Sequence, residues 1–440
     1  MDGSGCLGGR ETKMNYPEAI DYLQKLTKFG YNFGLERIAE LLRRFSNPHL
    51  KMKIIHVGGT NGKGSTSAMM DSILRESGCK VGLYTSPHLH SYNERFRLNG
   101  ETIQKQVLAD LITELRPHLD DMVNHGFEHP TEFEVGTALA FIYFFREKVD
   151  FLVLEVGLGG AIDSTNVVVP VLSIITNVAM DHMEYLGNTI EEIAAVKAGI
   201  IKKEVPLITA ATGEALKVIL QKCRELSAPA TVVGKDIQWR ELRHGLDGQF
   251  IEVDGRKGKY KDLYIPLLGR HQQVNASTAV AAVEVLMEMN IIPSDQAIQS
   301  GLASTFWPAR MEIVNRKPMV IIDAAHNYDG ALALRRTLEE YFPGKRVVLI
   351  LGMLGDKERT RVVSELAPMA AVVIVTKPNS PRAGDWQLLA EEVRKQGKPV
   401  ETIESIDEAV KAGLASAGSN DLVVITGSFY MVAQARESFL

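Results

Sequence analysis

Hydrophobic positions along the chain follow two periods, and each period predicts a different kind of element. Apolar residues at i, i+3 and i+4 spacing predict amphipathic helices over 16–29 and 35–45, which we expect to cover the edge of a sheet. Runs of consecutive, mostly apolar residues predict strands over 53–57, 80–84, 149–157 and 171–178. The last two runs are typical of strands that are buried on both faces, as in parallel sheets.

Predicted strands and helices alternate along the chain, and one segment of predicted hairpins interrupts this alternation. Further helices are predicted over 131–148, 189–201, 269–289 and 294–303. Asn188 is the predicted cap of the second of them. Between the second and third, residues 237–267 predict β-hairpins, because Leu246-Asp247-Gly248 and Asp254-Gly255 have the composition of tight turns. We interpret this segment as a peripheral β element.

A second α/β series follows residues 307–310, which we interpret as a linker. Its strands are predicted over 319–323, 346–351, 371–376 and 421–426. Strands that alternate with helices favour a mostly parallel sheet, as in the first series. The predicted organisation is a flexible N-terminus at 1–15, a large α/β domain at 16–305 and a smaller α/β domain at 306–440.

Composition and charge exclude several classes of protein. The chain has 440 residues, 45% hydrophobic, so it can bury sizeable cores. A formal net charge of -5 gives no general attraction to nucleic acid or to anionic membranes, and we expect neither as a partner. Cys6, Cys79 and Cys223 are isolated, which argues against a disulfide framework. Because the N-terminal segment has no apolar region of the kind found in export signals, we expect no export and a cytoplasmic location. We also expect a monomer.

The strongest candidate for chemistry lies between a predicted strand and a predicted helix. It reads Gly59-Thr60-Asn61-Gly62-Lys63-Gly64-Ser65-Thr66. Such a loop can bind phosphates through its backbone N–H groups and its lysine, while Ser65 or Thr66 holds Mg²⁺. The spacing departs from G-x-x-x-x-G-K-[ST], because Val57 takes the place of the first glycine and Gly64 follows Lys63 directly. The alternative interpretation is a glycine-rich turn without a ligand.

Polar residues at other strand ends belong to the same expected crevice, since ligands of parallel sheets bind beyond the carboxyl ends of the strands. Ser86 could contact Mg²⁺ or phosphate, although its spacing alone favours a simple turn. Glu155 lies inside an apolar strand and therefore requires a cation or a basic partner. Lys197 lies on an apolar helix stripe, so it either snorkels to water or is buried with a lowered pKa. His182 is a candidate ligand, and residues 163–166 place polar groups at a loop tip.

Eight short motifs occur in order along nearly the whole chain. They are Gly59-Thr60-Asn61-Gly62-Lys63-Gly64-Ser65, Thr85-Ser86-Pro87-His88-Leu89, Leu154-Glu155-Val156-Gly157-Leu158-Gly159-Gly160, Asp181-His182, Lys197-Ala198-Gly199-Ile200-Ile201-Lys202, Trp307-Pro308-Ala309-Arg310, Asp323-Ala324-Ala325-His326-Asn327 and Gly352-Met353-Leu354-Gly355-Asp356-Lys357. This set resembles the folylpolyglutamate synthase/dihydrofolate synthase branch of the Mur ligases. The resemblance implies a P-loop-type Mur ligase central domain with a mostly parallel sheet and a smaller, Rossmann-like C-terminal domain.

The resemblance also implies roles for individual residues. Ser86 and Glu155 match ligands of one Mg²⁺, and His182 with Lys197 matches the site of a second, the lysine being carbamylated. Nucleotide contacts are implied at Gly59, Thr60, Asn61, Gly62, Lys63, Gly64, Ser65, Thr66, Asn275, Arg310 and Asp323. Substrate contacts are predicted at His326 and Ser428. For Asp323, the alternative to a nucleotide contact is a structural role as the N-cap of the helix that follows it. Lys63, His182 and Lys197 are the predicted catalytic residues.

The activity that the resemblance implies is the ATP-dependent addition of L-glutamate to folate polyglutamates, to dihydropteroate, or to both, through an acyl phosphate. Its cofactors would be ATP and two Mg²⁺ ions, and its partners only small-molecule substrates. One rival interpretation is another Mur-type amino-acid ligase. The other, from a different class, is a nucleotide-dependent switch or transport ATPase, in which Lys63 would matter but Lys197 and Asp323 would not.

Overall fold

The largest sheet has eight strands and is mostly parallel. The chain is described here by a computed structural model that covers residues 13–30, 32–291 and 296–440. The sheet order is β4-β3-β2-β5-β1-β6-β7-β8, and its only antiparallel pairs are β4 with β3 and β3 with β2. Its strands are β1 (Ile54–Gly58), β2 (Val81–Tyr84), β3 (Phe96–Leu98), β4 (Glu101–Thr102), β5 (Phe151–Glu155), β6 (Leu172–Ile175), β7 (Leu207–Thr209) and β8 (Ala230–Val232).

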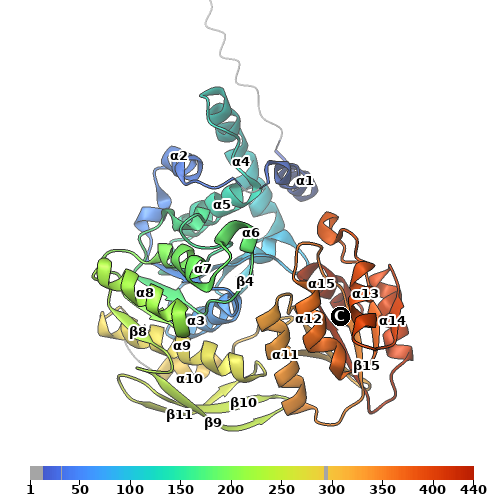
Figure 1. Cartoon of the computed structure of the whole chain (residues 1–440). Coiled ribbons are helices and arrows are strands. Elements are labelled where there is room, and N and C mark those ends of the chain that lie inside the picture. Colours follow the sequence, from blue (N-terminus) through green and yellow to red (C-terminus); the bar gives the residue numbers. More distant parts are fainter. Residues whose placement is uncertain (1–12, 31, 292–295) are drawn as a thin grey trace, which may run out of the picture.

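Helices cover both faces of this sheet and give three layers (Figure 1). The helices are α1 (Tyr16–Leu26), α2 (Glu36–Arg44), α3 (Lys63–Glu76), α4 (Lys105–Asn124), α5 (Glu132–Arg146), α6 (Met183–Leu186), α7 (Ile190–Lys197), α8 (Gly213–Glu225), α9 (Arg270–Glu288) and α10 (Gln296–Ala303). Ile55 packs toward α3, α9 and α10, whereas its neighbour Ile54 packs toward α1, α2, α4 and α5. The alternation of side chains along a strand thus supplies two cores.

The first two helices lie elsewhere than the sequence predicts. α1 packs on α4 and α5, and α2 packs on α5 and α4. The edges of the sheet are β4 and β8, so the prediction that these helices cover an edge is wrong. Their apolar stripes are buried instead against the helices that already cover the face of the sheet. The prediction that Asn188 caps the following helix is also wrong, because Thr189 accepts the hydrogen bond from Glu192 N and caps α7.

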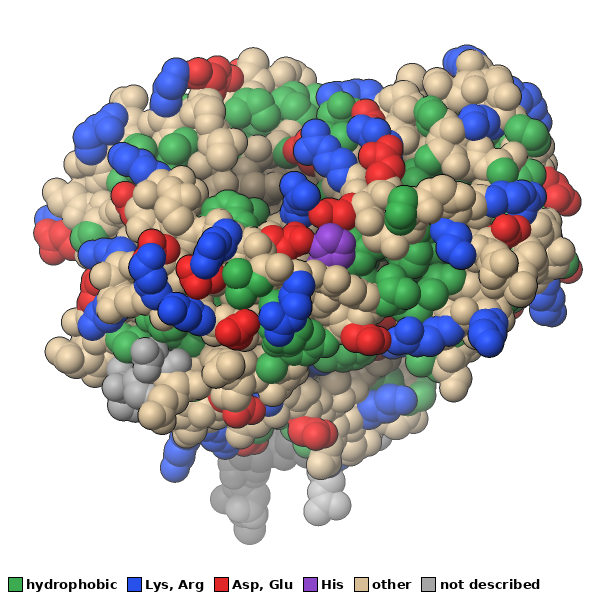
Figure 2. Space-filling view, turned by 90° about the horizontal axis from the view of Figure 1, so that it is seen from below, with side chains coloured by type: hydrophobic (Ala, Val, Ile, Leu, Met, Phe, Trp, Pro, Cys, Tyr) green, Lys and Arg blue, Asp and Glu red, His purple; other side chains and the backbone are tan. Residues whose placement is uncertain are grey.

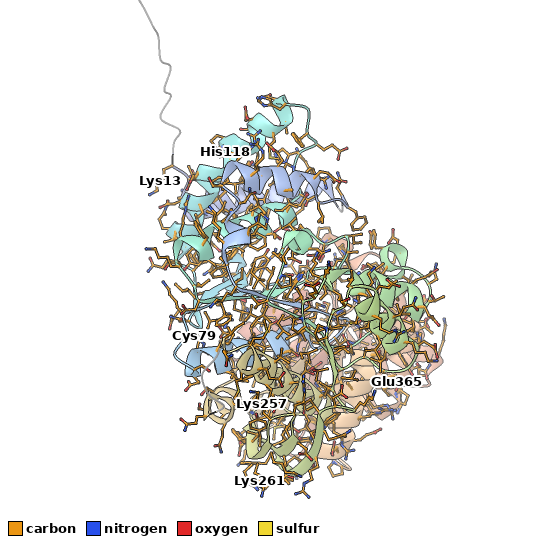
Figure 3. The ribbon with its side chains drawn as sticks, turned by 90° about the vertical axis from the view of Figure 1, so that its left-hand side faces the viewer. Lys13, Cys79, His118, Lys257, Lys261 and Glu365 are labelled. Carbon is orange, nitrogen blue, oxygen red and sulfur yellow. The ribbon has the colours of Figure 1, made fainter. Side chains whose placement is uncertain are left out.

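Residues 237–267 form the predicted hairpins. β9 (Gln238–Gly245), β10 (Gly248–Asp254) and β11 (Lys259–Ile265) make an antiparallel sheet in the order β11-β10-β9. The sheet packs on α9, and in Figure 1 it lies below that helix. Buried Glu284 of α9 accepts hydrogen bonds from Arg256 N and Lys257 N, which holds the β10–β11 turn against the helix. In Figure 3, Lys257 and Lys261 lie at the opposite end of the molecule from His118 of α4.

The C-terminal part of the chain, residues 312–440, forms a separate six-stranded sheet in the order β12-β13-β17-β14-β15-β16. Its strands are β12 (Glu312–Arg316), β13 (Met319–Asp323), β14 (Val347–Leu351), β15 (Ala370–Val375), β16 (Val400–Thr402) and β17 (Leu422–Thr426). Its helices are α11 (Tyr328–Tyr341), α12 (Arg359–Leu366), α13 (Leu388–Lys395), α14 (Ile406–Ala415) and α15 (Phe429–Glu437). The four predicted strands are confirmed within two residues, but the short, half-exposed edge strands β12 and β16 were not predicted.

The remaining expectations concern the surface and the N-terminus. Residues 1–12, and with them Cys6 and most of the predicted flexible terminus, lie outside the described residues. Cys79, labelled at the edge of the molecule in Figure 3, and buried Cys223 are free thiols. On the face shown in Figure 2, Lys and Arg side chains are interspersed with Asp and Glu. None of the helices in the described ranges is both long and apolar enough to cross a bilayer.

The contact between α10 and α3 allows a test of how tightly the phosphate-loop helix is packed. A Cβ added at Gly301 of α10 would lie 2.4 Å from Ile73 Cα of α3. Gly→Ala inside a helix is ordinarily favourable by about 1 kcal/mol. Here we expect Gly301→Ala to lower the free energy of unfolding by about 2 kcal/mol, because the helices must separate. Denaturant unfolding measures this change. Gly258→Ala, where a Cβ meets no heavy atom within 4 Å, should leave the value within about 0.5 kcal/mol.

Candidate active site

The loop between β1 and α3 can be built only with glycine at two of its positions. Gly59 has φ +137°, and a Cβ there would lie 2.0 Å from Thr176 Oγ1 at the end of β6. Gly62 has φ +84° and precedes the first helical residue, Lys63. A Cβ on Gly62 would lie 2.5 Å from Asn275 Oδ1 of α9. The loop backbone is therefore pressed between the end of β6 and α9, with the α3 N-terminus open to an anion.

Lys63 and Lys197 share one acceptor in this loop. Lys63 Nζ donates to the carbonyls of Gly59 at 3.2 Å and Thr60 at 3.0 Å, and Lys197 Nζ donates to Gly59 at 3.0 Å. Lys197 is 4% exposed, so the snorkelling interpretation is wrong and the buried one is confirmed. Burial, and secondarily the charge of Lys63, lowers the pKa of Lys197 to about 7.

Glu155 ends β5 beside Val57 of β1, as the parallel register requires. Its Oε2 accepts a hydrogen bond of 3.1 Å from Ser86 N, so Ser86 lies at the site rather than in a distant turn. Burial raises the pKa of Glu155 to about 7, although Lys63, Ser86 N and Arg310 oppose the shift. The chemistry of this pair suits a divalent cation, because a buried carboxylate with a single hydrogen bond and an adjacent hydroxyl are both oxygen ligands.

Asp163 also belongs to this region, and its setting corrects an expectation. Residues 163–166 are buried rather than exposed at a loop tip. The Asp163 carboxylate accepts hydrogen bonds from Leu158 N at 2.7 Å and Thr165 N at 2.9 Å, and burial raises its pKa. The charge of Asp163 reaches Lys63 and Lys197, which shows that it lies near both ammonium groups.

A second cluster joins the two sheets. Asp181, in the loop after β6, accepts hydrogen bonds from Lys357 Nζ at 2.7 Å and from Asn327 Nδ2 at 2.9 Å. His182 Nε2 lies 3.3 Å from Lys357 Nζ, and His326 Nε2 lies 3.8 Å from Asp181 Oδ2. Lys357 follows β14, while His326 and Asn327 follow β13. Loops from both parts of the chain thus meet at one place.

Electrostatics in this junction cluster follow from its burial. Although burial opposes it, the charges of Lys357 and the two histidines hold the pKa of Asp181 well below its ordinary value. Burial lowers the pKa of both His182 and His326 to about 4, so both imidazoles are neutral at pH 7. Sequence reasoning assigned no role to Asp181 or Lys357, although both lie in motifs that it singled out. The signal available was their position at strand ends.

The other predicted contacts lie around these two clusters. Asn275 Nδ2 donates to Gln272 Oε1, and Gln272 Nε2 lies 3.4 Å from Ser65 Oγ. Asn61 and Asn327 exchange side-chain hydrogen bonds of 3.2 and 3.0 Å, which ties the phosphate loop to the C-terminal part. Thr66 is buried one position further along α3 than Ser65, and its Oγ1 has no partner among the described residues.

Three predicted residues come from the C-terminal part. Asp323 accepts hydrogen bonds from Met311 N and Ala325 N, so it does not cap α11. Asn327 is that cap. The Arg310 guanidinium lies 5.0 Å from the centre of the Phe429 ring, and the charges of Asp323 and Glu155 both act on it. Ser428 is buried and caps α15 by accepting from Met431 N, so its hydroxyl already has a structural partner.

The comparisons with known proteins agree over almost the whole chain. Models of the Mur ligase middle domain and of the Mur ligase glutamate ligase domain match residues 57–283 and 309–429. A dihydrofolate synthase/folylpolyglutamate synthase of Bacillus subtilis is 38% identical over 426 residues, which are 96% of this chain and 98% of the relative. A Mycobacterium tuberculosis folylpolyglutamate synthase solved with ADP is 31% identical, with a TM-score of 0.90 over 97% of this chain and 99% of that one.

A third comparison includes a second ligand. An Escherichia coli structure in complex with DHPP and ADP is 30% identical to this chain, with a TM-score of 0.87. The likeness covers 97% of this chain and 98% of that one. The shared extent includes both sheets and the segment that joins them.

The raised pKa of Glu155 predicts a pH dependence of stability. The folded protein keeps this proton up to about pH 7, whereas the unfolded chain releases it near 4.5. The contribution is therefore fully present below pH 4.5 and is lost as pH rises through 7. In EDTA, we expect the wild type to lose about 3 kcal/mol relative to Glu155→Gln between pH 4.5 and pH 8. Urea unfolding of both proteins at several pH values measures this, and parallel profiles would contradict the assignment.

Proposed function

Since the chain belongs to the folylpolyglutamate synthase/dihydrofolate synthase family of Mur ligases and is an ATP-dependent ligase, we propose that it adds L-glutamate to two kinds of acceptor. One is a tetrahydrofolate or its polyglutamates, and the other is dihydropteroate. The observation that carries this proposal is the junction cluster. Residues of the C-terminal sheet, Lys357 and His326, reach Asp181 beside the phosphate loop, as a two-substrate reaction between the parts requires.

The chemistry follows from the low reactivity of a carboxylate. The acceptor's carboxylate attacks the γ-phosphorus of ATP, ADP leaves, and an acyl phosphate forms. The amine of glutamate then attacks the acyl carbon, and phosphate leaves with the electron pair of the broken C–O bond. Lys63 and the N–H groups at the start of α3 bind the phosphates and stabilise charge that develops during transfer. The neutral imidazole of His326 can accept the proton that the amine must lose, and that of His182 can do so only where it does not hold a metal ion.

Two Mg²⁺ ions fit the residues of this site. Ser86 and Glu155 would hold one, and His182 with a carbamylated Lys197 would hold the second. When bound, the ions neutralise charge on the transferring phosphoryl group. Carbamylation of Lys197 is supported by its burial and its lowered pKa, because only the neutral amine reacts with carbon dioxide. It would replace a buried ammonium by an oxygen ligand.

Three further properties are part of this proposal. We place the boundary between an N-terminal segment, an ATP-binding domain and a glutamate-ligase domain at residues 15 and 305, although Met14 is already buried and Asn15 caps α1. The second boundary is supported by the two sheets, since β8 ends at Val232 and β12 begins at Glu312. A monomer and a cytoplasmic location are the simplest expectations for a small-molecule ligase with free thiols. Gel filtration and cell fractionation would test them.

Mass spectrometry of the products tests the substrates directly. Protein is incubated with ATP, Mg²⁺ and L-glutamate, and either dihydropteroate or a tetrahydrofolate is added. We expect a gain of one glutamyl unit on dihydropteroate and of one or more units on the folate. A gain on only one acceptor would assign a single activity. Nucleotide turnover that is independent of both acceptors and of glutamate would instead favour a switch ATPase.

Substitution of Lys197 tests the role proposed for its side chain. We expect Lys197→Ala to lower kcat for glutamate addition by roughly 100-fold or more, because a metal-ligand oxygen is lost. Added formate or acetate should restore part of the rate, since a small carboxylate can occupy the emptied space. Lys203→Ala is the matched control, because Lys203 is 77% exposed in the same segment and should keep full activity. Equal losses in both variants would count against a role for carbamylated Lys197.

A further inference from the structure

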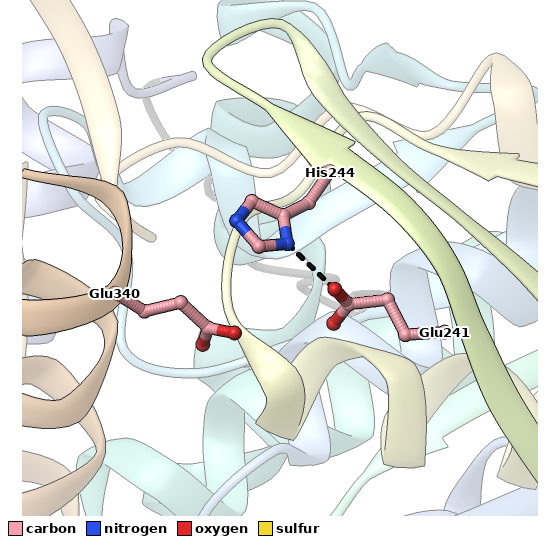
Figure 4. Close-up of side chains that lie close together, drawn as sticks. All are labelled: Glu241, His244 and Glu340. Carbon is pink, nitrogen blue, oxygen red and sulfur yellow. Dashed lines mark hydrogen bonds and ion pairs between the residues drawn. The ribbon is translucent and has the colours of Figure 1, made fainter.

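A histidine and two glutamates converge away from the active site, where the hairpin sheet meets α11. Glu241 and His244 lie on β9, and Glu340 lies near the end of α11 (Figure 4). One ligand atom of each lies within 4.8 Å of the others. In Figure 4, the edge of the imidazole that carries both nitrogens faces the two carboxylates. Donor atoms in a tetrahedral zinc site are about 3.3 Å apart, so small side-chain rotations would bring these three to a common ion.

The surroundings hold Glu241 and His244 in place. The Glu241 carboxylate lies 2.6 Å from His244 Nδ1 and accepts a second hydrogen bond of 2.6 Å from Gln273 Nε2. The His244 ring packs on Tyr341 with ring centres 4.5 Å apart. Gln273 is itself buried and bonded to Gln249 at 2.7 Å. Side chains fixed by such outer contacts are typical of built metal sites rather than of casual surface clusters.

One cation already lies beside this cluster. Arg270 donates to the Glu340 carboxylate from Nε at 3.1 Å and from Nη2 at 3.0 Å, but its own side chain is 76% exposed. Among the described residues, no hydrogen bond or ion pair joins Glu340 to Glu241 or to His244. The two carboxylates therefore lie close together with separate partners. A dipositive ion would have to displace this two-donor ion pair, and the exposure of the Arg270 side chain allows its guanidinium to turn to water when that happens.

We propose that Glu241, His244 and Glu340 form a site for a transition-metal ion of the Zn²⁺ class. One imidazole with two carboxylates is a donor set that suits Zn²⁺ and Co²⁺, whereas Mg²⁺ and Ca²⁺ prefer oxygen ligands alone. A water would complete the tetrahedron. The site does not rest on the ligase proposal, since none of these residues belongs to the active site.

The position of the site gives it a mechanical consequence. β9 belongs to the hairpin sheet that packs on α9, and Glu340 belongs to the helix whose first turn is capped by Asn327. Asn327 contacts Asn61 of the phosphate loop and Asp181. An ion bound at Glu340 would therefore tether the far end of α11 to the N-terminal part and restrict rotation between the two parts.

Calorimetric titration with ZnCl₂, in excess Mg²⁺ so that hard oxygen sites are filled, tests the proposal. We expect the wild type to bind one equivalent of Zn²⁺ more than His244→Ala or Glu340→Gln. Arg270→Ala should bind that equivalent about tenfold more tightly, because the competing cation is gone. His125→Ala is the matched control, since His125 is an exposed histidine beside Asp121 on α4 and offers no third ligand. It should bind as the wild type does.

If a variant folds poorly, the visible spectrum of Co²⁺ bound to the wild type still tests the proposal. The wild type itself should show the intense bands of four-coordinate Co²⁺, and Zn²⁺ should remove them. The more conservative variant His244→Gln should lack them. Equal Zn²⁺ stoichiometry and affinity in the wild type, His244→Ala and Glu340→Gln would overturn the proposal and leave the Glu241–His244 and Glu340–Arg270 contacts as two separate ion pairs.

Discussion

Two lysines that donate to one loop carbonyl set the geometry on which the rest of the site depends. Lys63 begins α3 and Lys197 ends α7, yet both ammonium groups reach Gly59 O. They can do so only because Gly59 turns with a positive φ against Thr176, where a side chain would not fit. The loop thus concentrates positive charge where phosphates are expected to bind. A buried carboxylate, Glu155, ends the neighbouring strand and faces the same charge.

Burial shifts the pKa values of these charged groups toward neutral pH. It raises the pKa of Glu155 and lowers that of Lys197, both to about 7, so the free protein need not hold two full charges away from water. Phosphates and divalent cations would bring the opposite charges that make the ionised forms favourable. The same burial leaves His182 and His326 neutral, because the nearby Lys357 already balances Asp181. The site therefore suits charged ligands, such as phosphates and divalent cations.

In the C-terminal sheet, as in the larger sheet, the polar residues of the site lie where parallel strands end. β13 and β14 are followed by loops that carry His326 and Lys357. In the first sheet, Lys63 follows the loop after β1, Glu155 is the last residue of β5, and Asp181 lies in the loop after β6. Ligands of parallel sheets bind beyond the carboxyl ends of the strands. Where two such edges face each other, each sheet can bind its own substrate, and the two substrates then meet between the sheets. Hydrogen bonds between Asn61 and Asn327 hold the two edges in contact. The Glu241, His244 and Glu340 cluster lies where the same parts approach each other at a different place.

The sequence by itself determined the strands, the glycine loop and most of the motif residues, because these depend on local patterns of apolar, β-branched and glycine residues. It could not decide whether Lys197 is buried, since an apolar stripe with one lysine suits both interpretations. It misplaced α1 and α2, missed α4 and the short strands β3, β4, β12 and β16, and assigned no role to Asp181 or Lys357. Those features depend on contacts between distant segments, such as the Asp181–Lys357 ion pair across 176 positions. Only the tertiary structure brings such residues together, and burial then sets their charge.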